Sequence, residues 1–202
     1  MIKIIAIAMS FGSFFPWNSK GFPFVPNDIQ KWDNLREKVI AAQGKNVSIL
    51  DIGCGVGFST SSSPGSLGIE PNLYLFRKAK KLFPNKKFQL GDVLFWNSEK
   101  KYDVVTTMFF LHEHPQHIRK NLIEKAKSCA TERIIIVDFC PDYEVDSEMN
   151  KRKPFLKDFL IHCHDELDEY TENVLLKGRV HMWTLDIKSE ECKTFDENDY
   201  DL

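Results

Sequence analysis

Acidic side chains and glycines follow the ends of successive apolar runs, where their types and spacing could bind a ligand. The first run, NVSILDIG, contains Asp51 and leads into Gly53, Gly55 and Gly57, which stand at alternate positions. Glycine adopts positive φ and lets the backbone approach a ligand closely. We expect a following helix N-terminus to offer free N–H groups as well. This loop is therefore a candidate for binding a nucleotide-containing ligand.

Two further acids follow the second and third apolar runs. Glu70 ends SLGIE, where a carboxylate can accept hydrogen bonds from both hydroxyls of a ribose and would repel a 2′-phosphate. Asp92 lies in KFQLGDV, where it can accept from an exocyclic amine beside the backbone of Val93. One such acid is more often a turn residue. Several in order at successive strand ends indicate a nucleoside site.

The fourth run, YDVVTTMFF, is followed by LHEHPQH, which concentrates titratable side chains. Histidine accepts a proton near neutral pH. We favour His112 as a general base or substrate-orienting group, with Glu113 as its partner or substitute, and we expect His114 to face the substrate. Two alternatives stay open. In the first, these side chains only cap a helix that starts near Pro115. In the second, His112, His114 and His117 bind a metal, although we predict no metal site.

The order of the elements predicts an α/β fold with a Rossmann-like three-layer αβα sandwich. Strands that alternate with helices imply a mostly parallel sheet. We expect one late strand, antiparallel at a trimmed edge. The predicted helices cover 27–43, 71–83, 115–130 and 153–170, and the predicted strands cover 46–53, 66–70, 87–93, 102–110, 133–140 and 179–187.

Composition narrows the class of protein. The chain has 202 residues with 43% hydrophobic content, which is enough for one domain with a substantial core. A net charge of -2 argues against a protein built mainly to bind nucleic acid. The five cysteines form no CxxC pair, which indicates a reducing compartment, and we expect a cytoplasmic location. No apolar run approaches the roughly 20 residues of a transmembrane helix.

An aromatic segment near the start, FGSFFPWNSKGFPFVPN, is the candidate substrate cover. Phe14, Phe15 and Trp17 could exclude water around an apolar acceptor, and His162 could reach it from the helix at 153–170. The alternative is a segment packed on the core. The run KIIAIA resembles a signal peptide, but its apolar core is shorter than usual.

These motifs together resemble the class I S-adenosylmethionine-dependent methyltransferases over roughly residues 45–140. LDIGCGVG is similar to the first motif of that family, GIEP to its ribose acid, GDV to its adenine contact and YDVV to its fourth strand. The resemblance implies S-adenosylmethionine (SAM) as cofactor and S-adenosylhomocysteine (SAH) as product. The implied cofactor-binding residues are Asp51, Gly53, Cys54, Gly55, Gly57, Glu70, Pro71, Asp92, Val93, Met108 and Phe109.

One branch of that family offers a narrower resemblance. MFFLHEHPQHIRKNLIEKA and IIIVDFCPDY are similar to segments of the small-molecule branch that includes ubiquinone/menaquinone-biosynthesis C-methyltransferases. Those quinone enzymes have an Arg-Asn pair where this chain has His112 and Glu113. The segment 58–67 is also shorter than the first helix of the family, so only a turn or two fits before Pro64 and Gly65.

The predicted function is methyl transfer to a small apolar or aromatic organic acceptor by a single methyltransferase domain, 1–202. Its parts are a lid at 1–26, a cofactor-binding core at 27–140, a substrate-side helix and edge strand at 141–190 and an acidic tail at 191–202. We expect a monomer or homodimer without a membrane span or nucleic-acid partner. An RNA or other nucleic-acid methyltransferase and a non-catalytic binding module remain alternatives. A nicotinamide dehydrogenase would need GxGxxG spacing instead.

Overall fold

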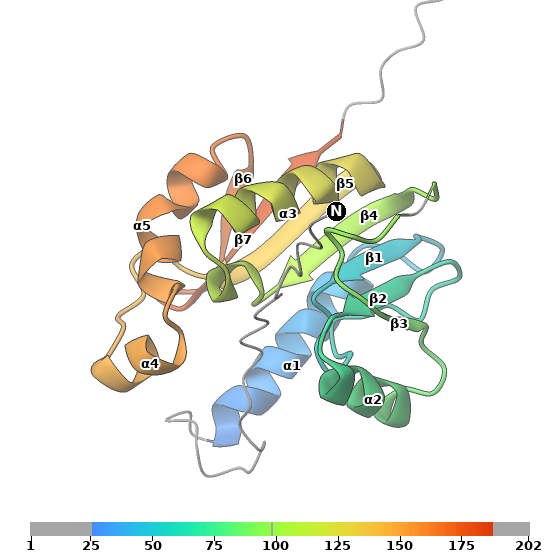
Figure 1. Cartoon of the computed structure of the whole chain (residues 1–202), viewed down its shortest axis with the longest axis horizontal. Helices are drawn as coiled ribbons and strands as arrows, with labels where there is room; N and C mark the ends of the chain where they lie inside the picture. Colours follow the sequence, from blue (N-terminus) through green and yellow to red (C-terminus); the bar gives the residue numbers. More distant parts are fainter. Residues whose placement is uncertain (1–25, 98, 188–202) are drawn as a thin grey trace, which may run out of the picture.

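A continuous seven-stranded sheet forms the centre of the computed structural model, which describes residues 26–97 and 99–187 (Figure 1). Its order is β3-β2-β1-β4-β5-β7-β6. β1 to β5 pair in parallel, whereas β7 pairs antiparallel with both β5 and β6. The strands are β1 (Ile49–Ile52), β2 (Leu67–Glu70), β3 (Phe88–Leu90), β4 (Tyr102–Met108), β5 (Ala130–Phe139), β6 (Thr171–Leu176) and β7 (Val180–Asp186).

Helices cover both faces of this sheet and complete the predicted three layers. α1 packs on one face, and α3 and α5 pack side by side on the other (Figure 1). None of the helices within 26–97 and 99–187 is long and apolar enough to cross a bilayer. The helices are α1 (Pro26–Ala41), α2 (Leu73–Leu82), the short 3-10 helix η1 (Leu111–Glu113), α3 (Gln116–Cys129), α4 (Ser147–Arg152) and α5 (Leu156–Glu166).

β1 shows why its near-continuous apolar run becomes a central strand. Leu50 and Ile52 are buried against the α3 and α5 side, whereas Ile49 is buried with Val39 of α1 on the opposite side. A strand covered on both faces needs apolar side chains at consecutive positions. The chain leaves β1 toward β2 and later returns to its other side as β4. This switch in strand order is where sheets of this kind bind ligands, outside the carboxyl ends of the strands.

Two predictions about the elements were wrong. The antiparallel edge is not trimmed, because β6 adds a second strand beside β7. The sequence TENV at its start is exposed and polar, so it lacks the apolar pattern of a buried strand. The predicted turn or two of helix after the glycine loop is absent as well, since residues 53–66, all of which the structure describes, form turns, bends and irregular chain.

Several boundaries also differ. α2 begins at Leu73 rather than Pro71, because Asn72 caps it by accepting from the backbone of Tyr74 and Leu75. The predicted helix 153–170 is shorter, and α4 precedes it. The predicted lid up to residue 25, with Phe14, Phe15 and Trp17, and the predicted tail at 191–202 lie outside the described residues.

Candidate active site

The glycine loop folds back from β1 onto the end of β2. The N–H groups of Gly53 and Cys54 both donate to the carbonyl of Ile69, at 3.0 and 3.1 Å. Gly53, Gly55 and Gly57 have φ of 68, 56 and 92°, where a side chain is strained. A Cβ at Gly53 would overlap the Phe110 ring, whereas one at Gly55 would meet no atom within 4 Å. The loop is therefore covered by Phe110 at Gly53 and uncovered at Gly55.

Asp51 forms a buried hydrogen-bond network beside this loop. Its carboxylate is fully buried and accepts hydrogen bonds from the hydroxyls of Ser59, Thr60 and Thr106 at 2.8, 2.7 and 3.3 Å. Burial raises the pKa of Asp51. Segment 58–67, which forms no helix, therefore contributes the hydroxyls of Ser59 and Thr60 to a side-chain network around one carboxylate. Cys54 is buried too, and burial raises the pKa of its thiol, so this thiol is not a nucleophile.

Glu70 joins the glycine loop to the end of β2. Its side chain is only 4% exposed, and its two oxygens accept from the N–H groups of Gly55 and Asn72, both at 2.8 Å. Burial raises the pKa of Glu70 to about 7. Each carboxylate oxygen can accept a second hydrogen bond. Glu70 is thus held in place with lone pairs left for a ligand, while the neighbouring Pro71 is exposed.

The predicted adenine contacts follow β3 at the same edge. The N–H of Gly91 donates to the carbonyl of Glu70 at 3.1 Å, so the ends of β2 and β3 are tied together. Asp92 accepts from the N–H of Leu94 at 3.0 Å and so caps a tight turn, and Val93 is buried. Both residues therefore directly follow Gly91, which is bonded to Glu70, and their contact with adenine stays a prediction.

Phe109 and Phe110 turn the chain sharply after β4. Phe109 has a φ of 57°, and it is the one non-glycine residue with positive φ among those that the structure describes. Strain of this kind persists where the surroundings enforce it, often at functional sites. The Arg36 guanidinium lies 4.6 Å from the centre of the Phe109 ring. The turn points Phe110 over Gly53, whereas Met108 packs into the buried cluster under α1.

His112 and Asp138 form a buried pair at the carboxyl edge. His112 Nδ1 lies 2.6 Å from Asp138 Oδ1, and the N–H of His112 donates to Oδ2 at 3.3 Å. His112 is 1% exposed, and its ring packs edge-on against Phe139 with centroids 4.8 Å apart. Its Nε2 has no hydrogen-bond partner in the part of the chain that the structure describes. Sequence reasoning missed Asp138, although it stands at the end of the fifth apolar run.

Glu113 and His114 flank this pair. Glu113 forms an ion pair with Lys153, and its carboxylate lies 3.9 Å from His112 Nε2. Burial alone would raise the pKa of Glu113, but the Lys153 ammonium with His112 and His114 outweighs burial and lowers it. His114 Nδ1 bonds to the carbonyl of Phe110 at 2.9 Å, and burial lowers the pKa of His114. A neutral His114 therefore donates from Nδ1 and keeps a lone pair on Nε2.

Arg119 holds the site together from α3. It is fully buried, and it binds Glu166 with two nitrogens at 2.7 and 2.6 Å. Its Nη1 also donates to Asp158 and to the carbonyl of His114, both at 2.8 Å. The guanidinium thus connects α3 and α5 to the turn after η1. The sequence did not predict these ion pairs, because Arg119 lies far along the chain from Asp158 and Glu166.

The other histidines do not join the pair of His112 and Asp138. His117 is exposed on α3. No group of three His, Cys, Asp or Glu side chains within 26–97 and 99–187 is placed to hold a metal ion. His162 bonds back to the carbonyl of Asp158 on its own helix at 2.8 Å. Its predicted contact with a substrate stays a prediction.

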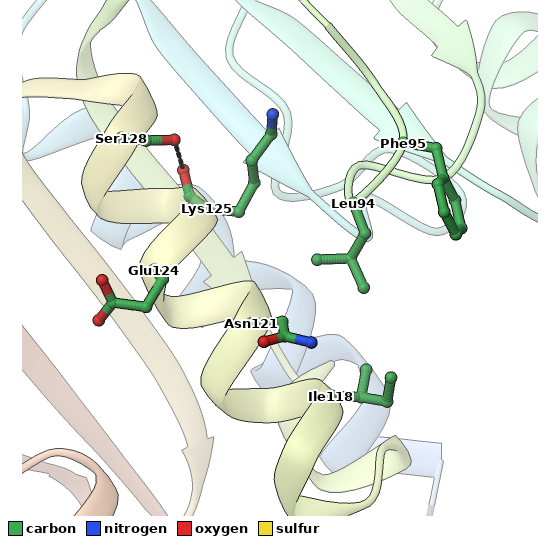
Figure 2. A pocket seen from close by; sticks show the side chains of 7 residues that line it. All are labelled: Leu94, Phe95, Ile118, Asn121, Glu124, Lys125 and Ser128. Carbon is green, nitrogen blue, oxygen red and sulfur yellow. Dashed lines mark hydrogen bonds between the residues drawn. The ribbon is translucent and has the colours of Figure 1, made fainter.

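A hollow of about 540 Å³ lies outside this arrangement, between the loop after β3 and α3 (Figure 2). Leu94 and Ile118 point toward one another across it, and Lys125 donates to the carbonyl of Trp96 at 2.8 Å. The hollow runs down α3 from Ile118 to Ser128, away from the carboxyl edge of the sheet. Its lining includes neither Glu70 nor His112.

Comparisons with known proteins agree with this geometry. No family model matches the chain. Protein 235L of Invertebrate iridescent virus 6, which carries a provisional methyltransferase name, is 36% identical over 72 residues. That match covers 33% of this chain and only 27% of the viral protein, so the chain spans about a quarter of that relative.

Two solved structures define the fold. Magnesium protoporphyrin IX methyltransferase from Synechocystis PCC 6803 with bound SAH has a TM-score of 0.62 at 18% identity, covering 85% of this chain and 91% of that chain. The TehB-like SAM-dependent methyltransferase from Corynebacterium glutamicum ATCC 13032 Kitasato has a TM-score of 0.53 at 17% identity, covering 81% and 97%. The chain therefore has the fold of the SAM-dependent methyltransferases, which is the fold that its motifs predict.

Proposed function

We propose that the chain transfers a methyl group from SAM to a small apolar or aromatic organic acceptor. The observation that carries this proposal is the meeting of the glycine loop, Glu70 and His112 at one edge of a sheet of this fold. The strand register supports it, because Ile52 pairs with both Ile69 and Thr107. The residues that end β1, β2 and β4 therefore lie level with one another.

The residues at this edge fit the parts of SAM. Gly55 leaves open space where a side chain would otherwise stand, and its loop can lie against the methionine portion. We propose that Glu70 accepts hydrogen bonds from the ribose hydroxyls and that Asp92 with Val93 contacts adenine, which their positions after β2 and β3 support. The buried carboxylates of Asp51 and Glu70 favour a cationic ligand over an anionic one.

Bound SAM would supply an electrophilic methyl group on a positively charged sulfur. The chain's own residues would bind, orient and desolvate the acceptor beside it. Phe110 lies directly over Gly53, and Phe139 packs against His112, so one aromatic ring lies beside the loop and another beside the imidazole. We infer that these rings bind the acceptor, joined by His114 and by the predicted cover of Phe14, Phe15 and Trp17.

His112 is our candidate for the group that takes a proton from the acceptor. It is held by Asp138 on one side and keeps a free nitrogen on the other. Glu113 is less suited to this role than the sequence indicates, because Lys153 holds its carboxylate and its lowered pKa makes it a weak base. We propose that Glu113 orients the acceptor or the imidazole.

Label transfer tests the function directly. The full chain is incubated with methyl-labelled SAM and, separately, with fractionated small-molecule extract and with RNA. We expect label in an organic small molecule and none in RNA. Label in RNA would favour the nucleic-acid alternative, and binding of SAM without transfer to any fraction would favour a non-catalytic module. The cytoplasmic location, the monomeric or homodimeric state and the quinone-like branch remain predictions from the sequence.

A further inference from the structure

We propose that Asp138 holds His112 with Nε2 as the proton acceptor, and that the group which receives the methyl is a neutral hydroxyl. This inference rests on the proposed function and narrows its acceptor class. It starts from the hydrogen bond between His112 Nδ1 and Asp138 Oδ1, and from the buried Nε2 opposite.

Two backbone N–H groups fix the Asp138 carboxyl group as an acceptor. Its Oδ1 accepts from Phe139 N–H at 2.8 Å and faces His112 Nδ1, and its Oδ2 accepts from His112 N–H. Because both Asp138 oxygens already act as acceptors for these backbone groups, we assign the proton between the two side chains to Nδ1. A neutral imidazole protonated at Nδ1 has its lone pair on Nε2. Asp138 therefore acts as a positioning residue that selects the basic nitrogen.

The surroundings of Nε2 argue for a ligand that brings a hydrogen-bond donor. A buried nitrogen lone pair without a partner costs on the order of 1–3 kcal/mol, which is why such groups are rare outside functional sites. The imidazole is 1% exposed and stacks edge-on against Phe139. A hydroxyl of the acceptor would donate a hydrogen bond to Nε2, and its apolar or aromatic part would pack against Phe139.

Other acceptor classes fit less well. A thioether or tertiary amine has no proton to give and would leave Nε2 unsatisfied. A carboxylate is already ionised, so it needs no base and would bring no proton to Nε2. An alkylammonium would need a carboxylate to bind it, but Lys153 holds Glu113, and His112 and Phe139 hold Asp138.

The reaction balances without any further reagent. The hydroxyl oxygen uses a lone pair to form the new O–CH₃ bond, and the O–H proton passes to His112 Nε2. The electron pair of the broken S–CH₃ bond stays on sulfur, so the sulfonium becomes a neutral thioether. His112 becomes an imidazolium beside the Asp138 carboxylate, which stabilises it, and it then releases the proton to water.

The first test measures the tautomer and needs no acceptor. Nitrogen-15 NMR of the full chain with labelled histidine, at about pH 8, is expected to show His112 protonated at Nδ1 and unprotonated at Nε2. In Asp138→Asn the side-chain NH₂ group must take the place of one carboxylate oxygen, facing either a backbone N–H group or His112 Nδ1. We expect part of the His112 population then to carry its proton on Nε2. A wild-type His112 protonated at Nε2 would overturn the proposal whatever the variant does.

The second test reads the atom that receives the methyl. SAM with a carbon-13 methyl is incubated with the small-molecule extract, and the carbon-13 shift of the product methyl identifies its neighbour. We expect an aryl or alkyl ether. A methyl on sulfur, carbon, a carboxylate or nitrogen would overturn the hydroxyl assignment while leaving the proposed function intact. SAH binding without any methylated product would instead contradict the proposed function.

Kinetics on that product separate positioning from folding. We expect His112→Gln to lower kcat by about 10²-fold or more and Asp138→Asn by at least about tenfold, with SAH affinity unchanged in both. Normal kcat in His112→Gln at saturating acceptor would contradict the base role. If a variant also loses SAH binding, the NMR result on the wild-type chain decides the question.

Discussion

The affinity for SAH should depend on pH through Glu70. Burial raises the pKa of this carboxyl to about 7, and both of its oxygens face backbone N–H donors at 2.8 Å. Only the ionised form accepts charge-assisted hydrogen bonds from two ribose hydroxyls. Ligand binding should therefore weaken as the pH falls through 7 and Glu70 becomes protonated.

The size of the effect follows from that pKa. With a value of about 7, the ionised fraction of Glu70 in the free protein drops from about nine-tenths at pH 8 to about one-tenth at pH 6. The association constant should fall about tenfold over the same interval, which corresponds to about 1.4 kcal/mol. Isothermal titration calorimetry with SAH at several pH values and constant ionic strength measures this directly.

Glu70→Gln is the matched control, because it keeps the shape of the side chain and removes its titration. We expect this variant to bind SAH more weakly at pH 8 and to lose most of the pH dependence. Titration of the ligand itself is common to both proteins and cancels in the comparison. Equal pH dependence in the wild type and in Glu70→Gln would refute the assignment of Glu70 as the ribose acid.

Three further predictions concern stability and the loop. The folded pKa of Glu70 lies above its ordinary value of 4.5, so the folded protein binds a proton more tightly than the unfolded chain. The free energy of unfolding should therefore decrease as the pH rises from about 4.5 to 7. Urea titration should show this decrease to be on the order of 3 kcal/mol larger than in Glu70→Gln. Gly53→Ala should lower Tm and SAH affinity more than Gly55→Ala. Both residues have positive φ, but only a Cβ at Gly53 would overlap Phe110. Equal losses of Tm and SAH affinity in calorimetry would contradict the loop geometry. Arg119→Met should cost about 3–5 kcal/mol in chemical denaturation by leaving Glu166 buried and unpaired, and adding Glu166→Gln should recover part of this; a cost below about 1 kcal/mol would mean that the network does not hold α3 to α5.

The sequence could predict the elements whose signal is local. The buried runs before Asp51 and Phe139 read as strands because both faces of the sheet are covered, so apolar residues stand at consecutive positions. Glu70 and Asp92 were predicted in position because acids at the ends of successive parallel strands must meet at one edge. The edge strand β6 was missed because its exposed residues need no apolar pattern.

The missing parts of the site depend on contacts between residues far apart in the chain. The partner of His112 is Asp138, which follows another strand and becomes a neighbour only because β4 and β5 pair with Met108 opposite Val137. Lys153, which follows α4, likewise meets Glu113 of η1 only in the folded chain, and Arg119 meets Glu166 only once α5 packs beside α3. The sequence predicted a cofactor contact for Asp51, which stays a prediction, but it did not indicate that Ser59 and Thr60 would donate to its carboxylate.

A crystal structure of the chain with SAH tests the central claim most directly. We expect the ribose hydroxyls on the Glu70 carboxylate, adenine beside Asp92 and Val93, and the sulfur on the His112 side of the glycine loop. SAH bound in the hollow between Leu94 and Ile118, with Glu70 still bonded only to Gly55 and Asn72, would contradict it.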